Sequence, residues 1–202
     1  ILEHEVPLED SGVKSEACWA ALQAGLAAHG LSDADVQRVV ITHAHVDHFG
    51  LAGRLVAASN AVVECSTVAE RWLVDFPARW QERIAFYEAH FLLGVGLPEE
   101  MNEVVTRYMT SMTDTCDPIP AERLRTFEIE GEIALGGQPW QVLFTPGHAS
   151  MQTCFYQPER EWLLSADCLL PKTPTPVVER PFSGTRHTPG LPKHIDSLNR
   201  LA

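Results

Sequence analysis

The sequence predicts a mixed α+β domain, and two patterns indicate this fold class. Apolar residues recur at helical spacing in long segments of the first half, whereas short apolar runs separated by turn residues predominate in the second half. Of the 202 residues, 45% are hydrophobic and 21% are charged, which is the balance of a packed globular domain. We therefore expect one domain over residues 1–202, with a helical insertion at about 67–115.

The first half is expected to alternate short strands with helices. Val39-Val40-Ile41 is a β-branched run typical of a buried strand, and Gly30 is suited to the left-handed cap of the helix before it. The elements expected here are a strand or loop over 1–12, a helix over 15–29, a strand over 39–41, a helical face at Leu51, Leu55 and Val56, and a strand over 61–65.

Helices are predicted over 67–93 and about 98–112, and Pro98 followed by two glutamates is a favourable start for the second. An amphipathic stripe supports the first helix and consists of Trp72, Phe76, Trp80, Ile84, Tyr87 and Phe91. Such a stripe is typical of helix packing. The alternative is a lid that forms an apolar wall for a substrate, in which Tyr87 or Tyr108 would donate to an oxyanion.

The second half is expected to be rich in strands. Residues 124–129 and 133–135 are predicted to pair as a hairpin around Glu130-Gly131. The further elements are strands over 140–145, 153–156 and 162–165, a proline-rich irregular loop over 171–192, and a helix that begins at Pro192.

Charge and cysteine content exclude several classes of protein. The formal net charge is −12, which disfavours nucleic-acid binding, and no apolar run is long enough for a membrane-spanning helix. The five cysteines are odd in number and form no CxxC pair, which favours a reducing compartment. No signal-peptide pattern follows Ile1, so we expect a cytoplasmic protein that acts on a small molecule.

The densest chemical signal is the segment Thr42-His43-Ala44-His45-Val46-Asp47-His48. In an extended chain His43 and His45 point to the same side, and a following helix would bring Asp47 and His48 to an adjacent position. Imidazole nitrogen and carboxylate oxygen are ligands of zinc, and also of iron and manganese. The segment therefore predicts a metal site.

Two further candidate ligands also follow predicted strands. His148 comes after Thr145-Pro146-Gly147, a sharp turn that would aim its ring off the strand end. Asp167 follows the strand over 162–165 in the same way, although it could instead cap a helix. One edge of a sheet could gather all three clusters into a single site.

An HxHxDH motif followed by Thr-Pro-Gly-His and then Ser-Ala-Asp resembles the metallo-β-lactamase superfamily, and Asp10-Ser11-Gly12 is similar to that family's Asp-Thr-Gly turn. The resemblance covers roughly residues 5–202 and implies a four-layer αββα sandwich with the metal site at one edge of two sheets. It implies that three residues hold the first of two zinc ions, two hold the second, and one bridges both. These ligands are His43, His45 and His148 for the first, Asp47 and His48 for the second, and Asp167 as the bridge.

The chain departs from the family pattern in three places. Almost no strand precedes Asp10, and the family's last ligand histidine is expected beyond Ala202, because His187 and His194 come too early. We therefore expect missing elements at both ends, weaker occupancy of the second metal position, and strand exchange with a second copy as one way to cover an open sheet edge. Ala166 replaces a glycine, which is a mild change.

The resemblance implies a hydrolase in which a metal-bridging hydroxide attacks a thioester, ester or lactone of the glyoxalase and lactonase type. Asp167 motivates this choice, because true β-lactamases of the family usually lack a bridging aspartate there. The alternatives are an iron-dependent oxidoreductase or dioxygenase, a β-lactam hydrolase, a phosphodiesterase and a non-catalytic interaction module.

Several residues have a structural explanation. Cys168 is expected to be a small buried side chain that points away from the ligands. Five other histidines are expected to be surface residues or hydrogen-bonded core residues, namely His4, His29, His90, His187 and His194.

Overall fold

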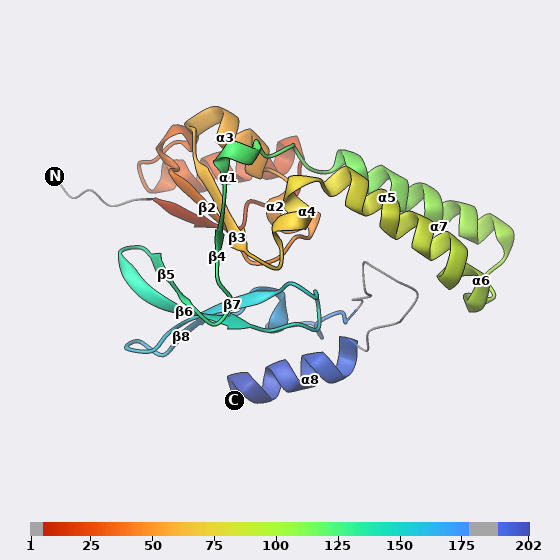
Figure 1. Cartoon of the computed structure of the whole chain (residues 1–202). Helices are drawn as coiled ribbons and strands as arrows, with labels where there is room; N and C mark the ends of the chain where they lie inside the picture. The colour runs from red at the N-terminus through yellow and green to blue at the C-terminus, as the bar shows by residue number, and fades with distance from the viewer. Residues whose placement is uncertain (1–5, 178–189) are drawn as a thin grey trace.

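The computed structural model describes residues 6–177 and 190–202, so His4 and His187 lie outside the described residues. Two four-stranded sheets stack face to face, and helices cover the outer face of each (Figure 1). This arrangement of helix, sheet, sheet and helix layers confirms the expected αββα sandwich.

The first sheet is parallel throughout, in the order β1-β2-β3-β4. Parallel neighbours need a crossover between them, and helices on the outer face supply it. The strands are β1 (Pro7–Glu9), β2 (Arg38–Ile41), β3 (Val62–Ser66) and β4 (Leu124–Phe127), and the helices between them include α1 (Glu16–Ala28), α2 (Val46–Phe49) and α3 (Ala52–Ser59).

Strand β2 shows why this sheet is buried on both faces. Its side chains alternate, so that Val39 and Ile41 pack with the helices while Val40 faces the second sheet. The outer cluster includes Trp19 of α1 and Leu55 of α3. A run that is apolar at every position is therefore required here, as is usual for parallel strands covered on both sides.

The second sheet is antiparallel, in the order β5-β6-β7-β8. Its strands are β5 (Glu132–Leu135), β6 (Gln138–Phe144), β7 (Thr153–Gln157) and β8 (Trp162–Leu164). Helix α8 (Gly190–Leu201) lies against its outer face (Figure 1). The Ser197 hydroxyl donates to the Pro146 carbonyl at 2.8 Å, and Arg200 Nη1 donates to the Phe144 carbonyl at 3.2 Å. These bonds attach α8 to the end of β6.

The hairpin predicted around Glu130-Gly131 is wrong. Strand β4 pairs in parallel with β3, whereas β5 pairs with β6 in the other sheet. The turn between β4 and β5 carries the chain from one sheet to the next, and Glu130 adopts a left-handed conformation there, with φ 62°. A strand, a turn and a strand look alike in sequence whether the two strands pair or separate.

The predicted helical segment is divided into several helices. These are α4 (Glu70–Val74), α5 (Phe76–Phe86), a π-helical turn (Tyr87–Phe91), α6 (Leu92–Val95) and α7 (Glu99–Ser111). The Asp75 carboxylate accepts a hydrogen bond from the Ala78 backbone N–H and begins α5 there. Trp72, Phe76 and Ile84 are buried, as expected for helix packing. The side chain of Phe91 lies outside the described residues.

Short 3₁₀ turns complete the described chain, at Asp33–Asp35, Met112–Asp114, Ala121–Arg123 and Ala166–Cys168. All five cysteines are free thiols. Within residues 6–177 and 190–202, no helix has both the length and the apolar character needed to cross a bilayer.

Candidate metal centre

The first two candidate ligands follow the carboxyl end of β2. The chain leaves the strand in an extended conformation, and His45 forms the N-terminal cap of α2 with φ −97° and ψ 144°. His43 is fully buried. His43 Nε2 lies 3.1 Å from His45 Nδ1, so both rings point to the same side, as the spacing predicts.

His148 completes a group of three imidazoles. The predicted turn follows β6, and His148 Nε2 lies 3.0 Å from His45 Nδ1. The other ring nitrogen of His148 is 2.7 Å from the Pro176 carbonyl. A carbonyl oxygen only accepts, so Nδ1 carries the proton and Nε2 directs its lone pair toward the other two rings.

Asp167 lies between two of the candidate histidines. Its Oδ2 is 3.3 Å from His148 Nε2 and 3.5 Å from His48 Nε2. It follows β8 within the 3₁₀ turn Ala166–Cys168. Ala166 has φ 43°, a left-handed conformation that glycine adopts with less strain than alanine.

The structure therefore brings five of the six candidate residues together. His43, His45 and His148 form one group whose ligand atoms lie within 4.8 Å of one another, and His43, His48 and Asp167 form a second group of the same kind. Asp47 lies at the margin. Its side chain is 65% exposed and its Oδ2 is 3.9 Å from His48 Nε2.

Asp10 is a residue of this site that the sequence argument did not assign. It follows β1, and its Oδ2 lies 2.7 Å from His48 Nδ1. The same carboxylate accepts hydrogen bonds from the Thr42 N–H at 2.9 Å and from the Thr42 hydroxyl at 2.8 Å. The sequence feature that pointed to Asp10 was the Asp10-Ser11-Gly12 turn. That turn alone does not predict which side chains the Asp10 carboxylate contacts.

Asp10 also orients His43 through Thr42. The Thr42 hydroxyl gives its one proton to Asp10, so its oxygen accepts the Nδ1–H of His43, 3.0 Å away. Asp10 thus holds protons on the outer nitrogens of two rings, and both Nε2 atoms are left to face the centre of the site. Metal-binding histidines commonly have such an outer partner.

The histidines have contrasting electrostatics. Burial, together with the neighbouring imidazoles, lowers the pKa of His43 well below its usual value. Burial also lowers the pKa of His45 to about 3, with contributions from the charges of His148, Arg83 and His48. Burial disfavours the charged form of His48 as well, but the hydrogen bond and charge of Asp10 outweigh it and raise the pKa to about 9.

The two sheets are joined at the edge that carries the site. The Thr42 carbonyl at the end of β2 accepts the backbone N–H of Thr153 at 3.0 Å and its hydroxyl at 2.9 Å. Because Thr153 begins β7, these bonds connect the first sheet to the second beside the histidines. The segment that carries His43 and His45 therefore begins at a residue, Thr42, that is hydrogen-bonded to the second sheet.

The donor set fits a divalent metal. The Nε2 atoms of His43 and His148 have free lone pairs, because the protons of these rings are on Nδ1. His45 Nδ1 faces both Nε2 atoms and carries at most one proton in the neutral ring. These three nitrogens and the Asp167 carboxylate converge on one region. Nitrogen and oxygen donors of this kind suit zinc, iron or manganese.

Other residues named from the sequence lie outside this cluster. His29 and His90 are exposed and Cys168 is buried, as expected. The expectation for His194 is wrong, because the ring is buried and Nδ1 has no hydrogen-bond partner among the described residues. The reason is packing: His194 of α8 is pressed against Gly147, where an added Cβ would lie 2.5 Å from its Cα.

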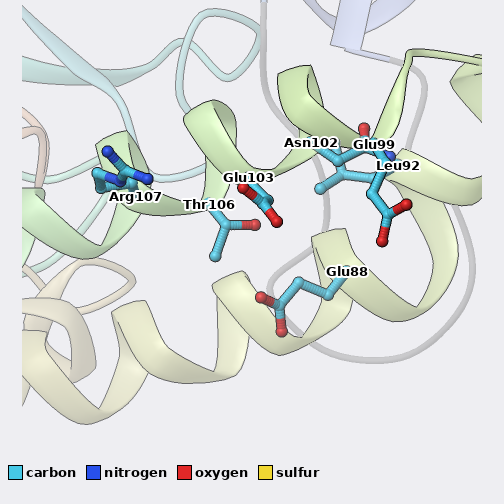
Figure 2. Close-up of a pocket in the computed structure, with 7 residues that line it drawn as sticks. All are labelled: Glu88, Leu92, Glu99, Asn102, Glu103, Thr106 and Arg107. Carbon is cyan, nitrogen blue, oxygen red and sulfur yellow. The ribbon is translucent and has the colours of Figure 1, made fainter.

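A separate pocket of about 420 Å³ opens between the π-helical turn and α7 (Figure 2). Its described lining residues are Glu88, Leu92, Glu99, Asn102, Glu103, Thr106 and Arg107. This set includes none of the six candidate ligands, so the pocket is distinct from the histidine cluster.

Known proteins are similar to this chain in sequence and in fold. The family described as "Metallo-beta-lactamase superfamily" matches residues 10–202. The sequence is 28% identical over 198 residues to "Probable metallo-hydrolase YqjP" of Bacillus subtilis, an alignment that covers 96% of this chain and 59% of the relative.

Two crystal structures are also similar. A metallo-β-lactamase family protein of Thermus thermophilus is 29% identical with a TM-score of 0.73, and the match covers 98% of this chain and 61% of that one. A β-lactamase domain protein of Burkholderia ambifaria shares the fold at 22% identity with a TM-score of 0.69, and the match covers 96% and 53%.

Because the family match includes nearly all of the sequence, the chain belongs to the metallo-β-lactamase superfamily. It spans about three-fifths of the length of the Bacillus and Thermus relatives.

Proposed function

We propose that the chain provides the metal centre of a hydrolase that cleaves a thioester, ester or lactone of a small molecule. The observation that carries this proposal is the position of Asp167 Oδ2 between His148 Nε2 and His48 Nε2, at 3.3 and 3.5 Å. A carboxylate with one histidine on each side supports a bridging role between two metal ions. The name of the Bacillus relative, a metallo-hydrolase, is in accord with this reaction class.

The proposed ligand sets follow the family resemblance, and the geometry brings five of the six residues together. His43, His45 and His148 would hold a first zinc ion, Asp47 and His48 would hold a second, and the Asp167 carboxylate would be shared by both. When bound, the ions lower the pKa of water and polarise a carbonyl group. Asp47 needs a rotamer change to take part, because its carboxylate is now mostly exposed. Iron or manganese would fit the same donors.

The residues of the chain prepare this site in three ways. Burial keeps His43 and His45 neutral, and a neutral ring is the form that binds a cation. Asp10 fixes the ring orientation of His48, directly, and of His43, through Thr42. The Pro176 carbonyl fixes His148. Apart from that of Asp47, the ligand atoms therefore converge without large rearrangement, which lowers the cost of ordering them on binding.

The bridging carboxylate also bears on the substrate. It is typical of the glyoxalase and lactonase branches that the sequence resembles, whereas true β-lactamases of the family usually lack it. We therefore place thioesters, esters and lactones before β-lactams. Fold alone would not separate these substrates, because many reactions share this architecture.

The test is a substrate panel assayed with zinc-loaded protein. It contains an acyl thioester, 4-nitrophenyl acetate, γ-butyrolactone, a penicillin and a carbapenem. We expect turnover of at least one of the first three and a loss of about a hundredfold in Asp167→Asn, a magnitude typical of a lost ligand or its partner. Asp196→Asn, an exposed position on α8, is the matched control and should retain wild-type activity.

Two results would contradict the proposal. Turnover of a β-lactam without any thioester, ester or lactone activity would reverse the substrate order. Iron as the retained metal together with oxygen consumption would instead establish the redox alternative.

A further inference from the structure

Helices α5 and α7 form a hairpin that extends away from both sheets (Figure 1). The Trp80 indole N–H of α5 donates to the Met109 carbonyl of α7, and the Met109 side chain is buried. Asn102 and Thr106 of α7 line the pocket between α7 and the π-helical turn. These residues mark the inner side of α7, which faces the rest of the hairpin.

A row of apolar side chains lies on the outer side of α7. Met101, Val104 and Tyr108 are spaced three and four residues apart, so they share one face of the helix. Their exposed fractions are 48%, 55% and 65%. Asn102 and Thr106 each lie two positions from Val104, which is about 200° around the helix and places the row away from the pocket. We call Met101, Val104 and Tyr108 the α7 row.

The α7 row is part of a larger apolar surface. Val95 and Leu97, which precede α7, are also exposed and add apolar area near the start of the helix. Single exposed apolar residues are common on proteins, but adjoining ones that form a patch indicate a contact with another molecule. Burial of such a patch drives association without specifying the partner. The charges beside the row supply that information.

The charged residues beside the α7 row change sign along the helix. Glu100 directly precedes Met101 and Arg107 directly precedes Tyr108, so both charges lie on the same flank of the row, about two turns apart. Neither forms an ion pair within residues 6–177 and 190–202. The first turn of α7 is acidic, with Glu99 beside Glu100. A flank that is negative at one end and positive at the other is complementary to an antiparallel copy of itself.

One antiparallel arrangement satisfies the apolar and the charged residues together. In two antiparallel helices related by a twofold axis, each flank meets the same flank of the other copy. When Met101 of one copy packs against Val104 of the second, Arg107 of the second copy lies two residues, or about 3 Å along the axis, from the level of Glu100. The symmetry forms each contact twice. A parallel pairing would instead set the acidic half of one helix beside the acidic half of the other.

We propose that two copies of this chain form a twofold dimer in which the α7 rows pack antiparallel and Glu100 of each copy pairs with Arg107 of the other. The contact contains none of the candidate metal ligands, so it is independent of the proposed function. Because each copy contributes essentially one helix, the buried area is at the small end for protein interfaces. We therefore expect a weak dimer, with a Kd on the order of micromolar.

The first measurement is sedimentation equilibrium of the purified chain over concentrations that bracket the expected Kd. Val104→Asp sets a carboxylate from each copy among the apolar side chains, and we expect it to weaken the dimer by roughly a hundredfold. Thr110→Asp is the matched control, because Thr110 is exposed on α7 but lies two positions from Tyr108, away from the row. Circular dichroism checks that both variants fold. A wild-type chain that stays monomeric, or an unchanged dimer in Val104→Asp, would overturn the inference.

The second measurement exchanges the charges. Glu100→Arg and Arg107→Glu each replace two attractive pairs with two repulsive ones, and we expect each variant to weaken the dimer by about tenfold. Mixing the two variants in equal amounts restores opposite charges at both pairs, so we expect heterodimers with nearly the wild-type Kd. A structural defect of either variant would not be repaired by mixing. Single variants with the wild-type Kd, or a mixture as weak as its components, would contradict the antiparallel pairing.

Discussion

The Asp10 carboxylate lies 2.7 Å from His48 Nδ1, although the two residues come from opposite ends of a crossover in the first sheet. This contact raises the pKa of His48 and fixes a proton on its outer nitrogen. The inner nitrogen then faces Asp167, 3.5 Å away. A half-buried carboxylate behind a histidine is the arrangement expected for an oriented metal ligand.

Replacing Asp10 with Asn should weaken zinc binding by about 10–100-fold, with the larger loss at the position held by His48 and Asp167. The amide has no charge to hold the outer proton, and it can present N–H where an acceptor is needed. Titration against a chromophoric chelator measures both affinities. Glu16→Gln, which removes a surface ion pair with Arg54, is the control and should bind zinc as the wild type does. Wild-type affinity in Asp10→Asn would show that the contact does not orient the ligand.

Glu9 predicts a pH dependence of stability. Burial, and next the charge of Asp10, raise the pKa of Glu9 from 4.5 to about 7. The folded chain therefore binds this proton more tightly than the unfolded chain, so Glu9 contributes a loss of stability as pH rises from about 4.5 to 7. Glutamine has no such proton. Glu9→Gln should thus gain at least about 1 kcal/mol relative to wild type at pH 8 compared with pH 4.

Urea unfolding of metal-free protein at the two pH values measures this difference. The exposed Glu122→Gln serves as the control and should show the same difference from wild type at both. If the difference in unfolding free energy between Glu9→Gln and wild type is the same at pH 4 and pH 8, the fold does not raise the pKa of Glu9.

Gly147 allows α8 to pack against the turn that carries His148. An added Cβ would lie 2.5 Å from both Cα and Cβ of His194, and the backbone has φ 153°. Gly147→Ala should therefore lower the free energy of unfolding by about 1–3 kcal/mol. Gly25→Ala is the matched control, because Gly25 lies in the middle of α1 and an added Cβ there would have no atom within 4 Å. This substitution should stabilise the protein by about 1 kcal/mol. Equal unfolding free energies for the two variants would contradict this packing.

The parts of this structure that local chemistry determines could be predicted from sequence. The buried strand at 39–41 follows from its β-branched apolar run, and the convergence of His43 with His45 follows from side-chain alternation; both are confirmed. The turn before His148 follows from Pro146 and Gly147. Non-local pairing could not be predicted. Strand β4 pairs with β3, with Val63 opposite Leu124 in the first sheet, and the residues around Glu130 do not reveal this pairing.

At the metal site, too, local features could be predicted from the sequence and contacts between distant segments could not. The motif predicted its candidate ligands, but the placement of Asp10 depends on β1 lying beside β2, which only the assembled sheet provides. Sequence patterns thus identified residues by type, and the fold showed which groups orient them.

The most direct test of the metal centre is elemental analysis after equilibration with zinc and removal of free metal. We expect at least one zinc per wild-type chain, loss of the ion bound by the three imidazoles in His45→Ala, and wild-type content in His29→Ala, an exposed position. A wild-type chain without zinc, or His45→Ala with the full content, would contradict the assignment of these histidines to a metal centre.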